Sequence, residues 1–117
     1  MKSKTGLMSL CAGAVLACWC GAASAADVVF GQIASLSNPA STSNAKGLIT
    51  GAQACFESIN AKGGIHGNKL KLDVRDDGLN GPKMVEITAQ LIDDPAIVGL
   101  LSFLNTAGLT ALAKQNA

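Results

Sequence analysis

The amino-acid sequence predicts an α/β fold of three layers around a doubly wound parallel sheet. Segments with strand patterns alternate with segments of helical period, in the order strand, helix, strand, helix, strand, helix. Such an order implies right-handed crossover connections between parallel strands. The first strand segment is nearly continuously apolar at its start and the third is a short continuous apolar run, whereas the second alternates between apolar and charged residues. Because a half-buried strand is typical of a sheet edge, we expect the strand order 2-1-3.

Residues 1–25 have the three-part pattern of a secretory signal peptide. Two lysines precede an uncharged apolar run over residues 7–20, and a small-x-small site ends at Ala25. The run is shorter than the roughly 20 residues that a membrane-spanning helix needs. We therefore expect export to the periplasm with cleavage after Ala25. The alternative is a lipoprotein, anchored through a cleavage box that ends at Cys18.

The charge balance of residues 26–117 argues against a nucleic-acid partner, and the cysteine content of this segment predicts a single buried thiol. Residues 26–117 contain seven Lys and Arg residues and eight Asp and Glu residues, a net charge of −1. No basic stripe is present, so we expect no nucleic-acid partner. Three of the four cysteines lie in the leader, and only Cys55 remains. Its place on an apolar helical stripe predicts a small buried side chain.

The first strand, loop and helix follow the leader. Residues 28–36 are largely apolar and predict a strand covered on both faces. Residues 37–44 are small and polar and contain proline, which predicts a loop. Apolar residues then recur at spacings of three and four over residues 45–61, which predicts a helix with Ser43 or Asn44 as its N-cap.

A glycine pair separates this helix from the second strand. Gly63 and Gly64 are expected to end the helix, because glycine adopts the left-handed conformation without a Cβ clash. Residues 69–76 then alternate strictly between apolar and charged positions. The apolar positions predict one buried face, formed by Leu70, Leu72 and Val74.

The second half of the chain predicts one more helix, a strand and the start of a third helix. Gly81 and Pro82 open the helix, and residues 93–95 end it. Residues 96–103 form a short continuous apolar run, which predicts a buried central strand. Helical period resumes at Leu109.

Parallel sheets bind ligands beyond the carboxyl ends of their strands, where the strand order reverses. Asn105 and Thr106 lie at a strand-to-helix junction, and the free N–H groups of a helix N-terminus suit a carboxylate. Thr106 can equally act as the helix N-cap. Asp76 and Asp77 point to opposite sides of a strand, so they predict a cap or a cleft contact rather than one shared site. The rule directs attention to three loops, at residues 37–44, 76–80 and 104–108.

The motifs of common enzymes and cofactor sites are missing from residues 26–117. The first turn lacks G-x-G-x-x-G, and no Walker loop, G-x-S-x-G, H-E-x-x-H or C-x-x-C occurs. The single histidine, His66, lies in a glycine-rich turn and is expected to be structural or solvated. We therefore expect a protein that is not an enzyme and has no cofactor and no metal.

Four motifs in order resemble type 1 periplasmic substrate-binding proteins of the leucine/isoleucine/valine-binding-protein-like kind. Residues 56–67 (FESINAKGGIHG) resemble that family's x-x-I-N-A-x-G-G-I-x-G segment. Residues 36–39 look like its L-S-G-P turn, with Asn38 in place of glycine. Residues 76–78 resemble its second-strand ending, and residues 101–106 resemble its third-strand exit.

The resemblance implies two α/β lobes that close on a small ligand and deliver it to an ABC transporter permease in the inner membrane. It implies a monomer, with amino acids or related solutes such as amides and urea as ligands. Hydroxyl and backbone groups of the strand-end loops would hold the ligand. Carried over by position, the ligand-binding residues are Ser37, Asn38, Phe103, Asn105 and Thr106.

The resemblance also bears on the extent of the domain. We expect residues 26–117 to be part of an N-terminal lobe, because a sheet of three parallel strands with apolar faces is incomplete. A ligand-sensing domain of a receptor or regulator is the alternative function for the same fold. The third-strand exit departs from the family pattern at Asn105, where glycine is frequent, and at Gly108, where a hydroxyl residue is frequent.

Overall fold

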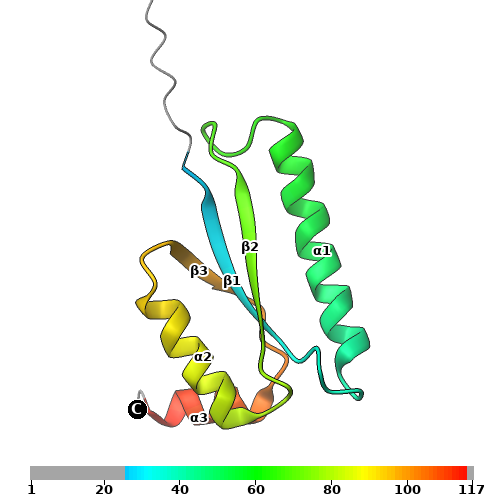
Figure 1. The fold of residues 1–117 in the computed structure, drawn as a ribbon, viewed down its shortest axis with the longest axis vertical. Coiled ribbons are helices and arrows are strands. Elements are labelled where there is room, and N and C mark those ends of the chain that lie inside the picture. Colours follow the sequence, from blue (N-terminus) through cyan, green and yellow to red (C-terminus); the bar gives the residue numbers. More distant parts are fainter. Residues whose placement is uncertain (1–25, 116–117) are drawn as a thin grey trace, which may run out of the picture.

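The computed structural model describes residues 26–115 and confirms a parallel α/β sheet with the strand order β2-β1-β3. Both strand pairs are parallel, and β1 lies in the middle of the sheet (Figure 1). The signal peptide and Cys18 lie outside the described residues. The elements are β1 (Val28–Ala34), α1 (Thr42–Ala61), β2 (Leu70–Asp76), α2 (Gly81–Asp93), β3 (Ile97–Leu101) and α3 (Thr106–Gln115).

The two faces of β1 meet different helices, which gives the three layers. Phe30 packs on Phe56 of α1, with ring centroids 5.6 Å apart. The next residue, Gly31, lies under Leu91 of α2 and Leu100 of β3, where an added Cβ would lie 3.1 Å from Leu91 and 2.8 Å from Leu100. Successive strand residues point to opposite faces, so α1 covers one face of the sheet and α2 covers the other.

The core lies between the sheet and the helices α2 and α3. Its buried centre consists of Ile33, Met84, Ile87 and Leu91. Partly buried apolar residues surround this centre, namely Ile97, Leu100, Phe103 and Leu112. Asn80 caps α2 by accepting a hydrogen bond from the Lys83 N–H at 2.9 Å, and Pro82 lies in the first turn of α2 as expected. Within residues 26–115, no helix is long and apolar enough to cross a membrane.

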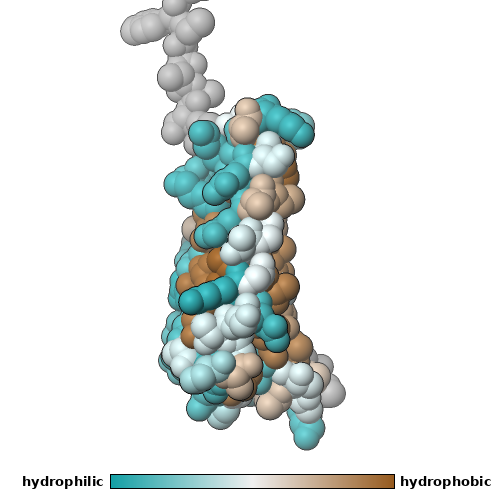
Figure 2. Space-filling model, turned by 90° about the vertical axis from the view of Figure 1, so that its right-hand side faces the viewer, coloured by the Kyte–Doolittle hydropathy of each residue, from teal (hydrophilic) through white to brown (hydrophobic). Residues whose placement is uncertain are grey.

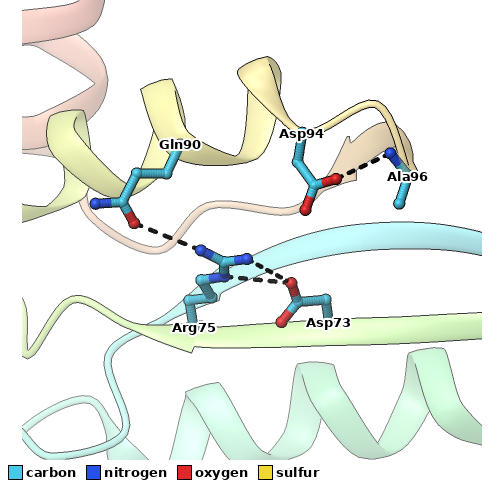
Figure 3. A network of polar contacts seen from close by, with 5 residues as sticks. All are labelled: Asp73, Arg75, Gln90, Asp94 and Ala96. Atoms are coloured by element: carbon cyan, nitrogen blue, oxygen red, sulfur yellow. Dashed lines mark hydrogen bonds and ion pairs between the residues drawn. The ribbon is translucent and has the colours of Figure 1, made fainter.

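The predicted buried face of β2 is confirmed in part, because Leu70 is buried whereas Leu72 and Val74 are half-buried. Its apolar residues Leu70 and Leu72 lie beside Phe56 of α1. On the α2 side, Arg75 donates to Asp73 at 2.9 Å and to Gln90 of α2 at 3.4 Å (Figure 3). The hydrogen bond with Asp73 is the largest of the causes that raise the pKa of Arg75. This charged face therefore joins the edge strand to α2.

The glycine pair ends α1 as predicted. Gly63 and Gly64 have φ values of 102° and 75°, and the Gly64 N–H donates to the Ile59 carbonyl at 3.0 Å. A bridge between Ile65 and Asn68 closes the following turn. His66 in that turn is exposed.

The start of α1 differs from the prediction. The helix begins at Thr42 rather than residue 45, and Ser41 takes the N-cap position instead of Ser43 or Asn44. The Ser41 hydroxyl donates to the Ser35 carbonyl at 3.0 Å, and the Thr42 hydroxyl donates to the Asn38 carbonyl at 2.6 Å. The hydroxyl groups thus satisfy carbonyls of the preceding loop, which shortens that loop and lets the helix start earlier. β1 likewise ends at Ala34 rather than at residue 36.

Two burial predictions are wrong. Among the described strands β3 pairs only with β1 and forms an outer strand, and Val98 is 59% exposed. β3 also spans residues 97–101 rather than 96–103. The second wrong prediction concerns Cys55, which is exposed. The apolar stripe of α1 is wider than the part of the helix that contacts the sheet, and the buried residue of this helix is Ala45. Figure 2 views the α1 side and shows apolar residues at the surface between polar ones.

Candidate functional site

The carboxyl ends of the three strands meet at one buried carboxylate. Asp77 directly follows β2 and is 1% exposed. Its Oδ1 accepts hydrogen bonds from the Ser35 hydroxyl at 2.6 Å and from the Leu79 N–H at 3.0 Å. Its Oδ2 accepts from the Asn105 Nδ2 at 2.9 Å. We call Ser35, Asp77 and Asn105 the strand-end junction, because each follows a different strand.

Asn105 links this junction to α3. Its side chain is 3% exposed, and its Oδ1 accepts a hydrogen bond from the Gly108 N–H at 3.0 Å. Asn105 therefore caps the helix, whereas Thr106 is the first helical residue and is exposed. Of the two roles considered for Thr106, the N-cap is therefore wrong, because the Asn105 amide is one residue closer to the strand and reaches the third amide of the helix.

Asp76 lies beside Asp77 but binds a different loop. Its Oδ1 accepts from the backbone N–H groups of Leu36 at 2.8 Å, Gly78 at 2.9 Å and Ser37 at 3.3 Å. A hydrogen bond from the Ser37 side chain, together with these backbone bonds, lowers the pKa of Asp76 from 3.8 to about 2. The two neighbouring carboxylates therefore occupy separate sites, as the strand geometry predicts.

The first strand-end loop is folded around Asn38. Its Oδ1 accepts from the Ala40 N–H at 2.9 Å, and its carbonyl accepts from the Thr42 N–H at 3.0 Å. Asn38 is half-buried, while Ser37 beside it is exposed. The loop thus presents a hydroxyl group at the edge where the strands end, and the asparagine amide stabilises the turn internally.

The exit from β3 has an unusual backbone. Ser102 has a φ of 43°, a conformation that costs energy for a residue with a side chain, and its Oγ accepts from the Gln32 Nε2 at 2.8 Å. Gln32 is buried, and its Oε1 has no hydrogen-bond partner among the described residues. Phe103 follows and packs against the core, so its ring is partly buried.

The structure brings the predicted site residues to one edge of the sheet but gives them different surroundings. Ser37 and Thr106 are exposed, Asn38 and Phe103 are partly buried, and Asn105 is buried. Sequence reasoning missed Ser35 and treated Asp77 only as a strand-end carboxylate. No local signal distinguishes Asp77 from Asp76 as the buried carboxylate, because the partners of Asp77 are 42 and 28 residues away. Within residues 26–115, no group of three His, Cys, Asp or Glu side chains is arranged to hold a metal.

The sequence pattern of a known family extends over all of this region. The family described as "Periplasmic binding protein" matches residues 27–117. The chain belongs to this family. A comparison with curated protein sequences found no match.

A solved structure supports the periplasmic binding protein fold. It is described as a fatty acid ABC transporter substrate-binding protein from Thermomonospora curvata, and it is 22% identical to this chain with a TM-score of 0.68. The match covers 76% of this chain and 22% of that chain. The chain therefore spans about a fifth of the length of the structure that it resembles.

Proposed function

We propose that this chain is part of an exported solute-binding protein that captures a small ligand and delivers it to an ABC permease. The convergence of three strand-end loops at the junction carries this proposal, because this is the edge where parallel α/β sheets bind ligands. The family supports the same role. The ligand is bound without chemical change, so the protein has no enzymatic activity.

The exposed hydroxyl groups of Ser37 and Thr106 are the proposed polar contacts of the ligand. Thr106 begins α3, and the first amides of a helix have no partner within the helix. Asn105 already binds the Gly108 N–H, and the preceding amides of this turn together with the two hydroxyl groups suit a carboxylate or an amide oxygen. Asn38 and Phe103 are proposed to form the adjoining wall of the ligand site. Asn105 is buried beneath this surface, and its proposed contribution is to hold the first turn of α3 in place.

The proposed ligand class is an amino acid or a related small polar solute, such as an amide or urea. The solved relative is described as binding a fatty acid, which shares a carboxylate with amino acids but carries an apolar tail. Ligand tests should therefore include both chemistries.

A thermal-shift screen tests the proposal, using protein expressed from the complete reading frame without its leader. The probes are L-leucine, L-glutamate, acetamide, urea and octanoate. One probe at 100 times its Kd should stabilise the fold by about 2.7 kcal/mol. Mass spectrometry of the recovered probe should show it unchanged.

Site variants make the screen specific. Ser37→Ala and Thr106→Ala should each weaken binding of the active probe about tenfold, because each removes one polar contact. Ser58→Ala is the matched control, since Ser58 is exposed on α1. If L-leucine, L-glutamate, acetamide and urea all leave the melting temperature unchanged, the proposed ligand class is wrong, whatever octanoate does.

A further inference from the structure

We propose that Asp77 is a positioning residue of the ligand site, which holds the first turn of α3 through Asn105. This inference rests on the proposed function for its effect on binding. Asp77 itself is buried and does not reach the surface, so it acts through other residues. The residues that it positions are Asn105, which caps α3, and Thr106, which is exposed at the start of α3.

The hydrogen bonds at Asp77 join three separate segments. The Ser35 hydroxyl comes from the end of β1, the Leu79 N–H from the loop after β2, and the Asn105 amide from the exit of β3. All three groups are donors, so the centre of the junction must be an acceptor with two oxygens. A carboxylate meets this requirement and has no donor of its own when ionised.

The Asn105 amide can satisfy both of its neighbours in only one orientation. Its Oδ1 faces the Gly108 N–H, and its Nδ2 therefore faces Asp77. A flipped amide would place its NH₂ group against the Gly108 N–H and its oxygen against the carboxylate. Asp77 thus fixes the orientation in which Asn105 caps α3.

Packing holds the other side of the same turn. A Cβ on Gly108 would overlap the Met84 Sδ and lie 3.0 Å from the Met84 Cβ and Cγ. The turn is therefore confined between the α2 side chain and the strand-end junction. Because this packing leaves no free space beside the turn, a change of the Asp77 side chain must displace Asn105.

A purely stabilising role does not account for this choice of residue. Burying a carboxylate costs free energy, and apolar groups of similar volume often stabilise a core equally well. What an apolar group cannot do is accept three hydrogen bonds from three strand ends. The carboxylate therefore provides a defined geometry at the ligand edge.

Exchanging the two side chains tests the inference. In the variant Asp77→Asn, the NH₂ groups of the two asparagines at positions 77 and 105 face each other. In the variant Asn105→Asp, two carboxylates face each other, so each single variant loses the hydrogen bond between these positions. In the double variant Asp77→Asn/Asn105→Asp, Asn at position 77 accepts from Ser35 and Leu79 and donates to Asp at position 105. That Asp accepts from Gly108, so every hydrogen bond of the junction is restored, and only the bond between positions 77 and 105 has its donor and acceptor reversed.

The readouts are amide hydrogen exchange at Gly108 and the Kd of the five probes, measured on the complete mature protein. Each single variant should exchange the Gly108 amide at least tenfold faster and bind the active probe at least tenfold more weakly. The double variant should recover both values to within about threefold of the unmodified protein. Ser35→Ala is the matched control, because it removes one bond of Asp77 but leaves the bond to Asn105. It should lower the melting temperature without changing exchange at Gly108.

The possible outcomes separate this inference from the proposed function. If the unmodified protein binds no probe, the proposed ligand class fails, while exchange at Gly108 still decides whether Asp77 positions α3. If the single variants do not fold, the double variant alone tests the positioning role. Its Gly108 exchange rate and its Kd then either match those of the unmodified protein or differ from them. Positioning is overturned if the double variant exchanges as fast as an uncapped helix. It is also overturned if single variants lower only the melting temperature and leave Gly108 exchange and Kd unchanged.

Discussion

Asp76 and Asp77 show how strongly the surroundings of a residue determine its role. Asp77 is enclosed and bonds to side chains of two other strand ends. Asp76 remains partly accessible and accepts hydrogen bonds from the Ser37 side chain and from the backbone N–H groups of Leu36 in the first loop and Gly78 in its own turn. The same side chain therefore organises α3 in one position and the Ser37 loop in the next.

The lowered pKa of Asp76 predicts a pH-dependent stability. Its folded-state pKa of about 2 lies below the ordinary value of 3.8, so ionised Asp76 stabilises the fold above about pH 4. This contribution is lost as the pH falls from 4 towards 2. Asp76→Asn should lower the free energy of unfolding by about 1 kcal/mol at pH 6, because partial exposure screens the charge.

Urea denaturation of both proteins between pH 6 and pH 2 measures this effect. The difference between the two free energies should shrink below pH 4, while contributions of other carboxylates cancel. A difference that is constant over the whole range would contradict the assignment to Asp76.

Asn60 has a structural role that explains its place in the family motif. Its Nδ2 donates to the Leu70 carbonyl at 2.9 Å, and its Oδ1 accepts from the Leu70 N–H at 2.8 Å. The side chain thus pairs with the backbone at the start of β2 and joins α1 to the edge of the sheet.

Removing this pair should destabilise the protein. We expect Asn60→Ala to cost about 1–3 kcal/mol, because it leaves two partly buried backbone groups without their partner. Glu57→Ala, one turn earlier and exposed, is the control and should change the free energy of unfolding by less than about 0.5 kcal/mol. Chemical denaturation compares the two, and equal costs would refute the role of the Asn60 side chain.

At the scale of elements, the contact between α2 and α3 depends on Gly108. Met84 of α2 occupies the space where a Cβ would lie. This packing accounts for the departure from the family pattern at this position, because a hydroxyl residue has no room beside Met84. The glycine and the methionine thus form one complementary pair.

A matched pair of glycine substitutions tests this contact. Gly108→Ala should destabilise the protein by about 1–3 kcal/mol, since overpacking exceeds the gain in helix propensity. Gly47→Ala in α1 has no atom within 4 Å of the new Cβ and should stabilise by up to about 1 kcal/mol. Thermal unfolding gives both values. Stabilisation by Gly108→Ala would show that α3 shifts without cost.

For the whole molecule, the face of the sheet that packs on α2 dominates stability. Leu91 is 0% exposed within the core, whereas its neighbour Ile92 is 68% exposed. By contrast, α1 buries only Ala45 and leaves Leu48 41% exposed. The two helical layers therefore contribute unequally to the free energy of unfolding.

Two neighbouring substitutions measure this asymmetry. Leu91→Ala should cost about 2–5 kcal/mol, because it removes contacts and leaves a cavity between α2 and β1. Ile92→Ala should change stability by less than about 0.5 kcal/mol in this chain. Urea denaturation distinguishes them. Similar costs for both would place the core elsewhere.

Sequence patterns predicted the elements well and burial less well. The order of elements, the strand order and the glycine stop at Gly63 follow from local periodicity and backbone preferences, and the structure confirms them. The exposure of Cys55 and Val98 differs from expectation, because an apolar residue reveals a preference for burial but not whether another element covers it. The early start of α1 was missed because the Thr42 hydroxyl binds the preceding loop.

The sequence by itself determined the α/β class, the order of the elements and the family resemblance, because these depend on residues close together in the chain. Only the tertiary structure decided which polar side chains are buried and what they hold. Asp77 meets Ser35 and Asn105 across 42 and 28 residues, and no local pattern encodes such partners. The physical reason is that a buried carboxylate is stable only where folding brings donors from distant strands to both of its oxygens.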